Sequence, residues 1–400
     1  MKQLFKYLEG DKTIWLMSII FGLISIITVY SFIPVLIRYT GGSTEFHLFK
    51  HMLILGAGFV LMFYVHKLNF KYFSRLAQIM LWLSVVLLLL TLVFGANING
   101  AKRWLMIPGI NQGFQTSDFA KLALVMYVAR MLVLNKDKLN NFKEGILPIL
   151  IPIGVICMLI LPQDFSTAGM LFGICMLLLF IGNVPYKFLL YIVGALVGMF
   201  LLVLLIGKAA PDLVPRAKTW TNRVEAFFDG GAASEEHPQV RSAKAAINNG
   251  GFWGKGVGKG EFKKTIPQAY ADFYFASFIE ENGLWGGISL IVFFLVLLYR
   301  VFKIAIRCEK SFGTYLVIGI GLSLIVQAFV NMMVPTGLVP VTGQNMPMLG
   351  LGGTSLWFTC ISLAIILSVS RTVYANDEED LDMENELQTT EVDNNKYEVE

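Results

Sequence analysis

The chain has 400 residues, of which 56% are hydrophobic and only 15% are charged, and its formal net charge is +4. A soluble domain usually carries about a quarter charged residues, so this composition excludes a water-soluble globular protein. The apolar residues run in blocks long enough to cross a bilayer, and the sequence therefore predicts an integral membrane protein.

Taken in chain order, the apolar blocks predict about ten transmembrane helices. The expected spans are Thr13–Val35, Leu48–Val65, Leu76–Phe94, Phe119–Leu134, Ile146–Leu161, Ala168–Ile181, Phe188–Ile206, Asp272–Tyr299, Thr314–Val334 and Gly350–Val369. The first block is too long for a cleavable signal, so we expect it to remain as the first span. No strand pattern or nucleotide-binding fingerprint is evident, and no nucleic-acid partner is expected. The predicted fold class is an all-α polytopic integral membrane protein.

The distribution of Lys and Arg predicts the orientation of these spans. With a cytoplasmic N-terminus, sixteen basic residues fall in inside segments and only four fall in the short outside loops. Both termini are then cytoplasmic, which requires an even number of spans. The segment 207–271, between spans seven and eight, becomes a long extracytoplasmic loop, and loops of this length are usually functional.

The end of the chain differs in composition from the membrane domain, which we place at residues 1–374. From Asp377 to Glu400 there are eleven acidic residues and one Lys, a local charge of −10. Such a run cannot bury a core, so residues 375–400 are predicted to form a disordered cytoplasmic tail. The four cysteines lie in or beside apolar blocks without CxxC spacing, which indicates neither a disulfide framework nor a metal site.

Ionisable residues at membrane depth need a partner or a water-filled cavity. Asp118 and Lys121 are three residues apart at the start of the fourth span, on one helix face, where they can neutralise each other. A structural salt bridge is the favoured interpretation, and a direct role toward a substrate is the alternative. Asp164 precedes the sixth span, and we expect it to cap that helix.

Three acids fall within ten residues at the start of the eighth span. Asp272 lies at the outer interface, where a carboxylate can reach both water and a lipid-linked substrate. The residues alone leave its role open between a helix cap and a catalytic group. Glu280 and Glu281 lie deeper in the same helix, and we expect them to pair with cations inside the bundle.

The external segments also carry cations beside aromatic residues. Lys102, Arg103 and Trp104 lie at the membrane edge, where they either anchor the protein at the interface or grip a diphosphate headgroup. In the long loop, Arg216 and Arg223 lie on an amphipathic stretch that we expect to rest on the membrane. The glycine-rich stretch NNGGFWGKGVGKG follows and is interpreted as flexible backbone.

These segments together resemble the SEDS family, which is named for shape, elongation, division and sporulation. The resemblance rests on GAKRW, FQTSDFAKLAL, FSTA, AINNGG-FWGKGVG, ADFYFA-IEENGLWGG and QAFVNMMV-TGLVPVTGQNMPMLGLGGTS, which occur here in the family's order up to about Tyr374. FQTSDFAK, TGQNMP, GGTSLWFTC and ILSVSR are more similar to the division-type members than to the elongation-type members.

The resemblance implies a peptidoglycan glycosyltransferase that polymerises lipid II at the outer face of the bacterial inner membrane, at the division septum. It also implies a class B penicillin-binding protein and other division proteins as partners. The family's essential loop aspartate falls on Asp272, its Arg-Trp pair on Arg103 and Trp104, and its acid–Lys pair on Asp118 and Lys121. The loop departs from the family pattern at Pro238 and Ser242.

In the mechanism that the resemblance implies, Asp272 accepts the proton of the attacking 4-hydroxyl of one sugar. The leaving diphosphate needs positive charge from external cations or from a divalent cation, Mg²⁺ or Mn²⁺. The residues expected to bind substrate are Lys102, Arg103, Trp104, Arg216, Arg223, Gln239 and Lys244. A lipid II flippase, an elongation-type polymerase and a non-catalytic scaffold are the alternatives. The concentration of charged groups toward the outer half favours an external enzyme.

Overall fold

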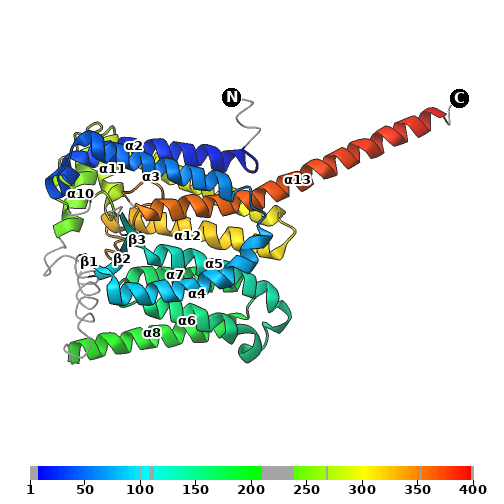
Figure 1. The fold of residues 1–400 in the computed structure, drawn as a ribbon, viewed down its shortest axis with the longest axis horizontal. Helices are drawn as coiled ribbons and strands as arrows, with labels where there is room; N and C mark the ends of the chain where they lie inside the picture. The colour runs from blue at the N-terminus through cyan, green and yellow to red at the C-terminus, as the bar shows by residue number, and fades with distance from the viewer. Residues whose placement is uncertain are drawn as a thin grey trace.

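The computed structural model describes residues 8–98, 101–107, 112–209, 238–266, 269–351 and 353–397. Long helices that run roughly parallel to one another form the body of the molecule (Figure 1). Their bounds are α2 Lys12–Thr40, α3 Thr44–Val65, α4 Lys71–Phe94, α5 Thr116–Leu134, α6 Leu147–Ile160, α7 Phe165–Ile181, α8 Tyr186–Ala209, α11 Tyr274–Arg307, α12 Ser311–Thr336 and α13 Thr354–Tyr397. Each predicted span corresponds to one of these helices.

Membrane-crossing character can be judged from length and composition. Within the described ranges, seven helical segments are long and apolar enough to cross a membrane, and two shorter apolar helices accompany them at Phe165–Ile181 and Tyr186–Leu201. This confirms the polytopic all-α membrane fold. Ten crossings, and the cytoplasmic placement of both termini, stay predictions.

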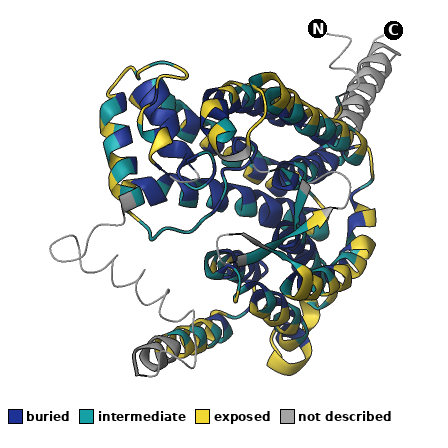
Figure 2. Cartoon of the chain, turned by 60° about the vertical axis from the view of Figure 1, so that its left-hand side comes forward, coloured by how far each residue is buried: buried dark blue, intermediate teal, exposed yellow. Residues whose placement is uncertain are grey.

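The most enclosed element is α5, which lies in the centre of the bundle. Almost every side of this helix is buried, including Asp118 and Lys121 near its start. It packs chiefly against α4 and α12, and the buried residues of the chain gather around the bundle interior in Figure 2. A helix that is buried all round forms the core on which other elements are positioned.

A small antiparallel sheet lies at one end of the bundle and contradicts the expectation of no strands. It consists of β1 Ala96–Ile98, β2 Ala101–Ile107 and β3 Gln112–Gln115, in the order β1-β2-β3. In the register, Trp104 faces Gln115. The strands are short and do not alternate between polar and apolar residues, so only pairing in the folded chain identifies them.

The long loop is also more ordered than its sequence predicted, over the part that the structure describes. It contains α10, Pro238–Gly250, and a 3₁₀ turn at Phe262–Lys264. The glycine-rich stretch between them is not flexible backbone but packs on α11. There α11 is kinked at Gly283, where φ is +73°. A Cβ on Gly283 would lie 2.3 Å from the carbonyl oxygen of Phe252, so only glycine fits this contact.

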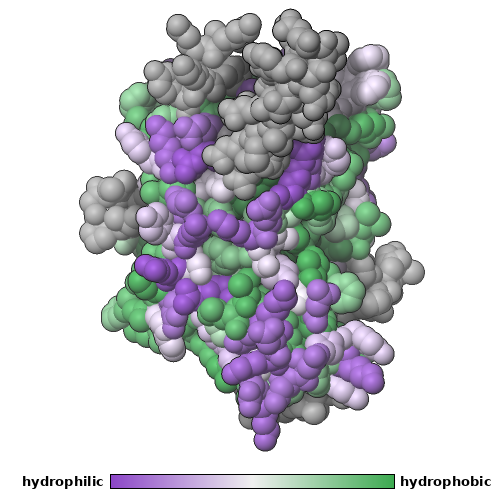
Figure 3. Space-filling view, turned by 90° about the vertical axis from the view of Figure 1, so that its right-hand side faces the viewer, coloured by the Kyte–Doolittle hydropathy of each residue, from purple (hydrophilic) through white to green (hydrophobic). Residues whose placement is uncertain are grey.

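At the acidic end of the chain, α13 continues as one helix to Tyr397 (Figure 1), and the disordered cytoplasmic tail at 375–400 stays a prediction. A helix that is already nucleated by packing can propagate at the gain of one hydrogen bond per residue, and Glu, Leu and Met are good helix formers. The face of the molecule from which this helix emerges gathers hydrophilic side chains, with hydrophobic ones along its sides (Figure 3).

Candidate active site

A polar cleft of about 420 Å³ opens beside the small sheet, whose strands β2 and β3 contribute to its lining. Elements far apart in the sequence form its wall: β2, β3, α5, α10, the turn before α11, α12, the segment after α12, and the start of α13. The lining residues are Arg103, Trp104, Gln115, Asp118, Lys121, Gln239, Tyr270, Ala271, Asp272, Gln327, Val341, Thr342, Gly343, Gln344, Asn345, Leu351 and Ser355.

Asp272 lies in this cleft and is half-buried. The N-cap position of α11 is occupied by Phe273, not by Asp272, so the structure does not support the cap interpretation. Asn331 of α12, which is fully buried, donates from Nδ2 to the carbonyl oxygens of Ala271 at 3.0 Å and Gln344 at 2.6 Å. These bonds fix the backbone that carries the carboxylate.

Arg103 on β2 brings a cation to the same cleft. Its Nη1 lies 3.1 Å from Oδ2 of Asp164, and its Nε donates to the carbonyl oxygen of Gln163 at 2.9 Å. Asp164 is only 4% exposed and also caps α7, where its Oδ1 accepts a hydrogen bond from the backbone N of Thr167. The predicted cap is confirmed, and the same carboxylate orients Arg103.

Gly343 lies between Asp272 and Arg103. A Cβ built on Gly343 would lie 3.7 Å from Oδ2 of Asp272 and 3.6 Å from Nη1 of Arg103, so both groups face the same point. The backbone of Gly343 has a φ of +69°, a conformation that favours glycine. The acid, the cation and the glycine together form a narrow site with one negative and one positive group.

Gly343→Ala is expected to lower turnover about tenfold, because its methyl group would lie between the carboxylate of Asp272 and the guanidinium of Arg103, where a substrate must fit, and about 1.4 kcal/mol added to a barrier is tenfold in rate. Initial rates of the purified variant on the lipid-linked sugar that the resemblance implies would measure this. Gly337→Ala is the matched control, since that glycine has a φ of +80° but does not line the cleft. Equal losses in the two variants would contradict a local effect at the site.

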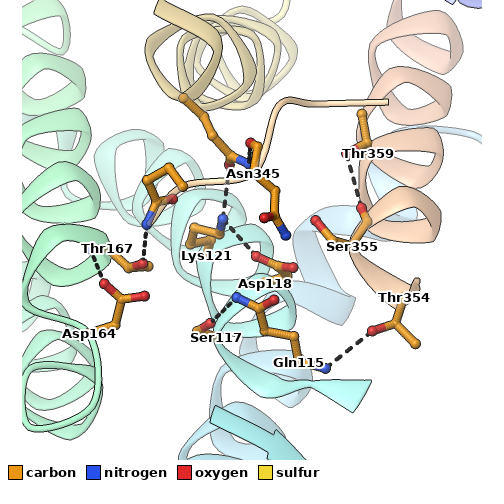
Figure 4. A network of polar contacts seen from close by, with 12 residues as sticks. Gln115, Ser117, Asp118, Lys121, Asp164, Thr167, Asn345, Thr354, Ser355 and Thr359 are labelled. Atoms are coloured by element: carbon orange, nitrogen blue, oxygen red, sulfur yellow. Dashed lines mark hydrogen bonds and ion pairs between the residues drawn. The ribbon is translucent and has the colours of Figure 1, made fainter. Parts of the chain in front are cut away.

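The predicted ion pair of α5 is confirmed. Nζ of Lys121 lies 2.7 Å from Oδ1 of Asp118, and it also donates to Oε1 of Gln327 at 3.0 Å. Gln327 in turn donates to the carbonyl oxygen of Asn345 at 2.8 Å, so the pair supports the segment after α12 (Figure 4). Asp118 and Lys121 also line the cleft, which leaves the alternative of a substrate contact in place.

Glu280 and Glu281, the two deeper glutamates of α11, have different partners. Glu281 pairs with Lys263 at 2.5 Å, and both side chains are buried, as predicted. The prediction that Glu280 pairs with a cation is wrong. Its Oε1 instead accepts hydrogen bonds from Nδ2 of Asn249 and from the backbone N–H groups of Glu261 and Phe262. The acidic residue Glu280 can be read from the sequence, but the backbone N–H groups of the loop that donate to its carboxylate cannot.

Of the remaining residues predicted to bind substrate, some line the cleft and others do not. Trp104 and Gln239 line the cleft. Lys102 does not line it: its Nζ donates to the carbonyl oxygen of Val93 at 3.2 Å. Lys244 is exposed on α10 beside Gly337, at the end of α12, and also lies outside the cleft lining. Arg216 and Arg223 lie outside the described residues.

Sequence reasoning missed the amide side chains of the cleft, Gln115, Gln327 and Gln344, and also Asn331, which supports the backbone at Asp272. Gln344 is 5% exposed and donates to Oγ1 of Thr167, and Gln327 connects Lys121 to Asn345. For Gln327 and Asn331 the available signal was an amide side chain among the apolar residues of a span, because buried polar groups need partners.

Among the described residues, no three His, Cys, Asp or Glu side chains gather in a way that would hold a metal ion. Mg²⁺ is usually held by one or two carboxylates together with substrate phosphates, so a substrate-bridged ion needs no larger cluster. The carboxylates that line the cleft, Asp118 and Asp272, fit that mode in number. The ion itself stays a prediction.

The chain is similar to a known protein family over most of its length. Residues 11–375 match the family model of FtsW, RodA and SpoVE, described as cell cycle protein. A protein of Geobacter sp. strain M18, named probable peptidoglycan glycosyltransferase FtsW, is 32% identical, over 90% of this chain and 97% of its own. Stage V sporulation protein E of Bacillus subtilis is 27% identical, over 92% of this chain and 98% of its own.

Solved structures agree with the fold. A chain from the structure titled "Structural coordination of polymerization and crosslinking by a peptidoglycan synthase complex" is 26% identical, with a TM-score of 0.71 over 91% of this chain and 98% of that one. Thermus thermophilus RodA, at 24% identity and a TM-score of 0.65, covers the same shares and shares the fold.

Proposed function

We propose that this chain, which belongs to the FtsW, RodA and SpoVE family of cell cycle proteins, is a peptidoglycan glycosyltransferase that polymerises lipid II into glycan strands during septal cell-wall synthesis. The observation that carries the proposal is the cleft in which Asp272 and Arg103 face one point beside Gly343. An acid and a cation on either side of a reacting centre suit a reaction that removes a proton and expels an anion.

In the proposed reaction, the 4-hydroxyl of one lipid II sugar attacks the anomeric carbon of another. A bond forms between that oxygen and the anomeric carbon, and the bond to the diphosphate breaks. Asp272 accepts the hydroxyl proton as the general base. The lipid diphosphate leaves with its electron pair, and Arg103, held in place by Asp164, stabilises the negative charge.

The setting of the enzyme is also part of the proposal. We place both termini in the cytoplasm and the cleft at the outer face of the inner membrane, from the distribution of Lys and Arg. The division septum is the expected location, since several relatives carry the FtsW name. A class B penicillin-binding protein is the expected partner, because the similar chain at 26% identity comes from a structure whose name describes polymerization and crosslinking by one peptidoglycan synthase complex.

Purified protein supplied with labelled lipid II, with and without its partner, tests the proposal against its alternatives. Glycan chains identify a polymerase. Movement of the headgroup across the bilayer without chain growth would identify a flippase and overturn the proposal. If neither occurs unless the partner's own activity is present, the protein is a scaffold, and the proposal is equally wrong.

A divalent cation is expected to assist the departure of the diphosphate. Chelation with EDTA should therefore lower polymerisation, and added Mg²⁺ or Mn²⁺ should restore it. Binding of labelled lipid II by the unmodified protein should also weaken in EDTA, which gives a readout separate from turnover. Full polymerisation in excess EDTA would contradict the role of the metal but not that of Asp272.

A further inference from the structure

Glu280 is a fully buried carboxylate that the proposed reaction does not use. It lies eight residues after Asp272, on the short part of α11 that precedes the kink at Gly283. We propose that Glu280 is a positioning residue, which fastens the glycine-rich loop and α10 to this short helix and so fixes Asp272 in the cleft. The inference rests on the proposed role of Asp272.

The contacts of Glu280 join two segments that are distant along the loop. Its Oε1 accepts hydrogen bonds from Nδ2 of Asn249 at 3.0 Å, from the backbone N of Glu261 at 2.8 Å and from the backbone N of Phe262 at 3.2 Å. Asn249 is the penultimate residue of α10, and Glu261 follows the glycine-rich stretch. One carboxylate oxygen therefore joins both ends of the loop through three hydrogen bonds.

The loop in turn caps the short helix. The backbone N of Lys255 donates to the carbonyl oxygen of Glu280 at 3.0 Å, and that of Gly256 donates to the carbonyl oxygen of Glu281 at 2.9 Å. On the other side of the kink, the backbone N of Leu284 donates to the carbonyl oxygen of Gly251 at 2.9 Å. The first two bonds satisfy carbonyl groups of the short helix, and the third satisfies an N–H group after the kink; helix ends otherwise leave such groups unpaired.

The adjacent ion pair fastens the same short helix to α2. Lys263 is 2% exposed, and its Nζ contacts Glu281 as well as the carbonyl and hydroxyl oxygens of Ser31. Tyr274, at the first turn of the short helix, bonds through its hydroxyl to Thr28 of the same α2 face at 2.9 Å. The helix is thus held at both of its ends.

Displacement of this helix would be transmitted to the cleft. All residues from Tyr274 to Glu281 are buried, so the helix cannot shift without moving its neighbours. Asp272 precedes it by two residues, and α10 carries Gln239 into the same cleft. Glu280 therefore joins the element that bears the acid to an element that lines its cleft, and a misplacement of about 1 Å can cost about 100-fold in rate.

The test compares Glu280→Ala with Glu280→Gln in the purified full chain, by measuring kcat and KM for lipid II polymerisation. Gln keeps one oxygen in the position of Oε1, so we expect Glu280→Gln to retain kcat within about threefold. Ala removes the acceptor, and we expect kcat to fall about 100-fold with KM changed less than threefold. Glu261→Gln is the matched control, since this exposed acid of the same loop contributes only its backbone N.

A purely structural role would reduce the yield or thermal stability of Glu280→Ala but leave the kcat of its folded fraction unchanged, and that result would overturn the inference. If Glu280→Ala does not fold, Asn249→Ala removes one donor and keeps the carboxylate. We then expect a kcat about tenfold lower, and unchanged kcat would overturn the inference. Asp272→Asn, assayed in parallel, separates the two proposals: full activity in that variant means that the base role itself has failed.

Discussion

Asp272→Ala is expected to lower glycan polymerisation by about 100- to 10,000-fold, the range that a general base contributes. The carboxylate is half-buried in the cleft, and its backbone is held by Asn331, so the substitution removes the proton acceptor without removing a core side chain. Gel analysis of glycan chains made from labelled lipid II by the purified variant would measure the loss.

Two further measurements make this result decisive. Thermal unfolding in detergent should be close to that of the unmodified protein, because Asp272 is not the N-cap of α11. Glu45→Gln is the control, since Glu45 is an exposed acid in the first turn of α3 and does not line the cleft. Normal chain synthesis by folded Asp272→Ala would refute the base role.

The second large effect is expected at the buried pair on α5. Lys121→Met should destabilise the protein by about 3–5 kcal/mol, because it leaves the carboxylate of Asp118 buried without its cation. The two side chains are 11% and 5% exposed, so solvent screens their interaction little. Thermal unfolding in detergent, followed by fluorescence, would report the loss.

The double variant Asp118→Leu with Lys121→Met separates structure from substrate contact. Replacement of both members of a buried pair by apolar residues is often neutral or stabilising, so we expect stability to recover. If the pair is structural, polymerisation recovers with it. A stable double variant without activity would show that the pair acts on the substrate, which is the alternative that its position in the cleft leaves in place.

The helices of this protein could be predicted closely from local composition. The predicted span Phe188–Ile206 corresponds to α8, Tyr186–Ala209, and Thr314–Val334 corresponds to α12, Ser311–Thr336. Long apolar blocks have few alternatives in a bilayer, because a helix satisfies its own backbone hydrogen bonds. Elements stabilised by pairing rather than by composition were missed, as the sheet around Trp104 illustrates.

The polytopic membrane fold, the shared helix face of Asp118 and Lys121, and the helix cap at Asp164 follow from the amino-acid sequence, since each depends on residues close together in the chain. The pairing of Arg103 with Asp164, and the meeting of Arg103 with Asp272 at Gly343, follow from the packing of the folded chain. The same packing decides that Glu280 binds loop amides and not a cation. Such contacts join segments far apart in sequence, so they follow from how the helices and loops pack and cannot be read from local pattern.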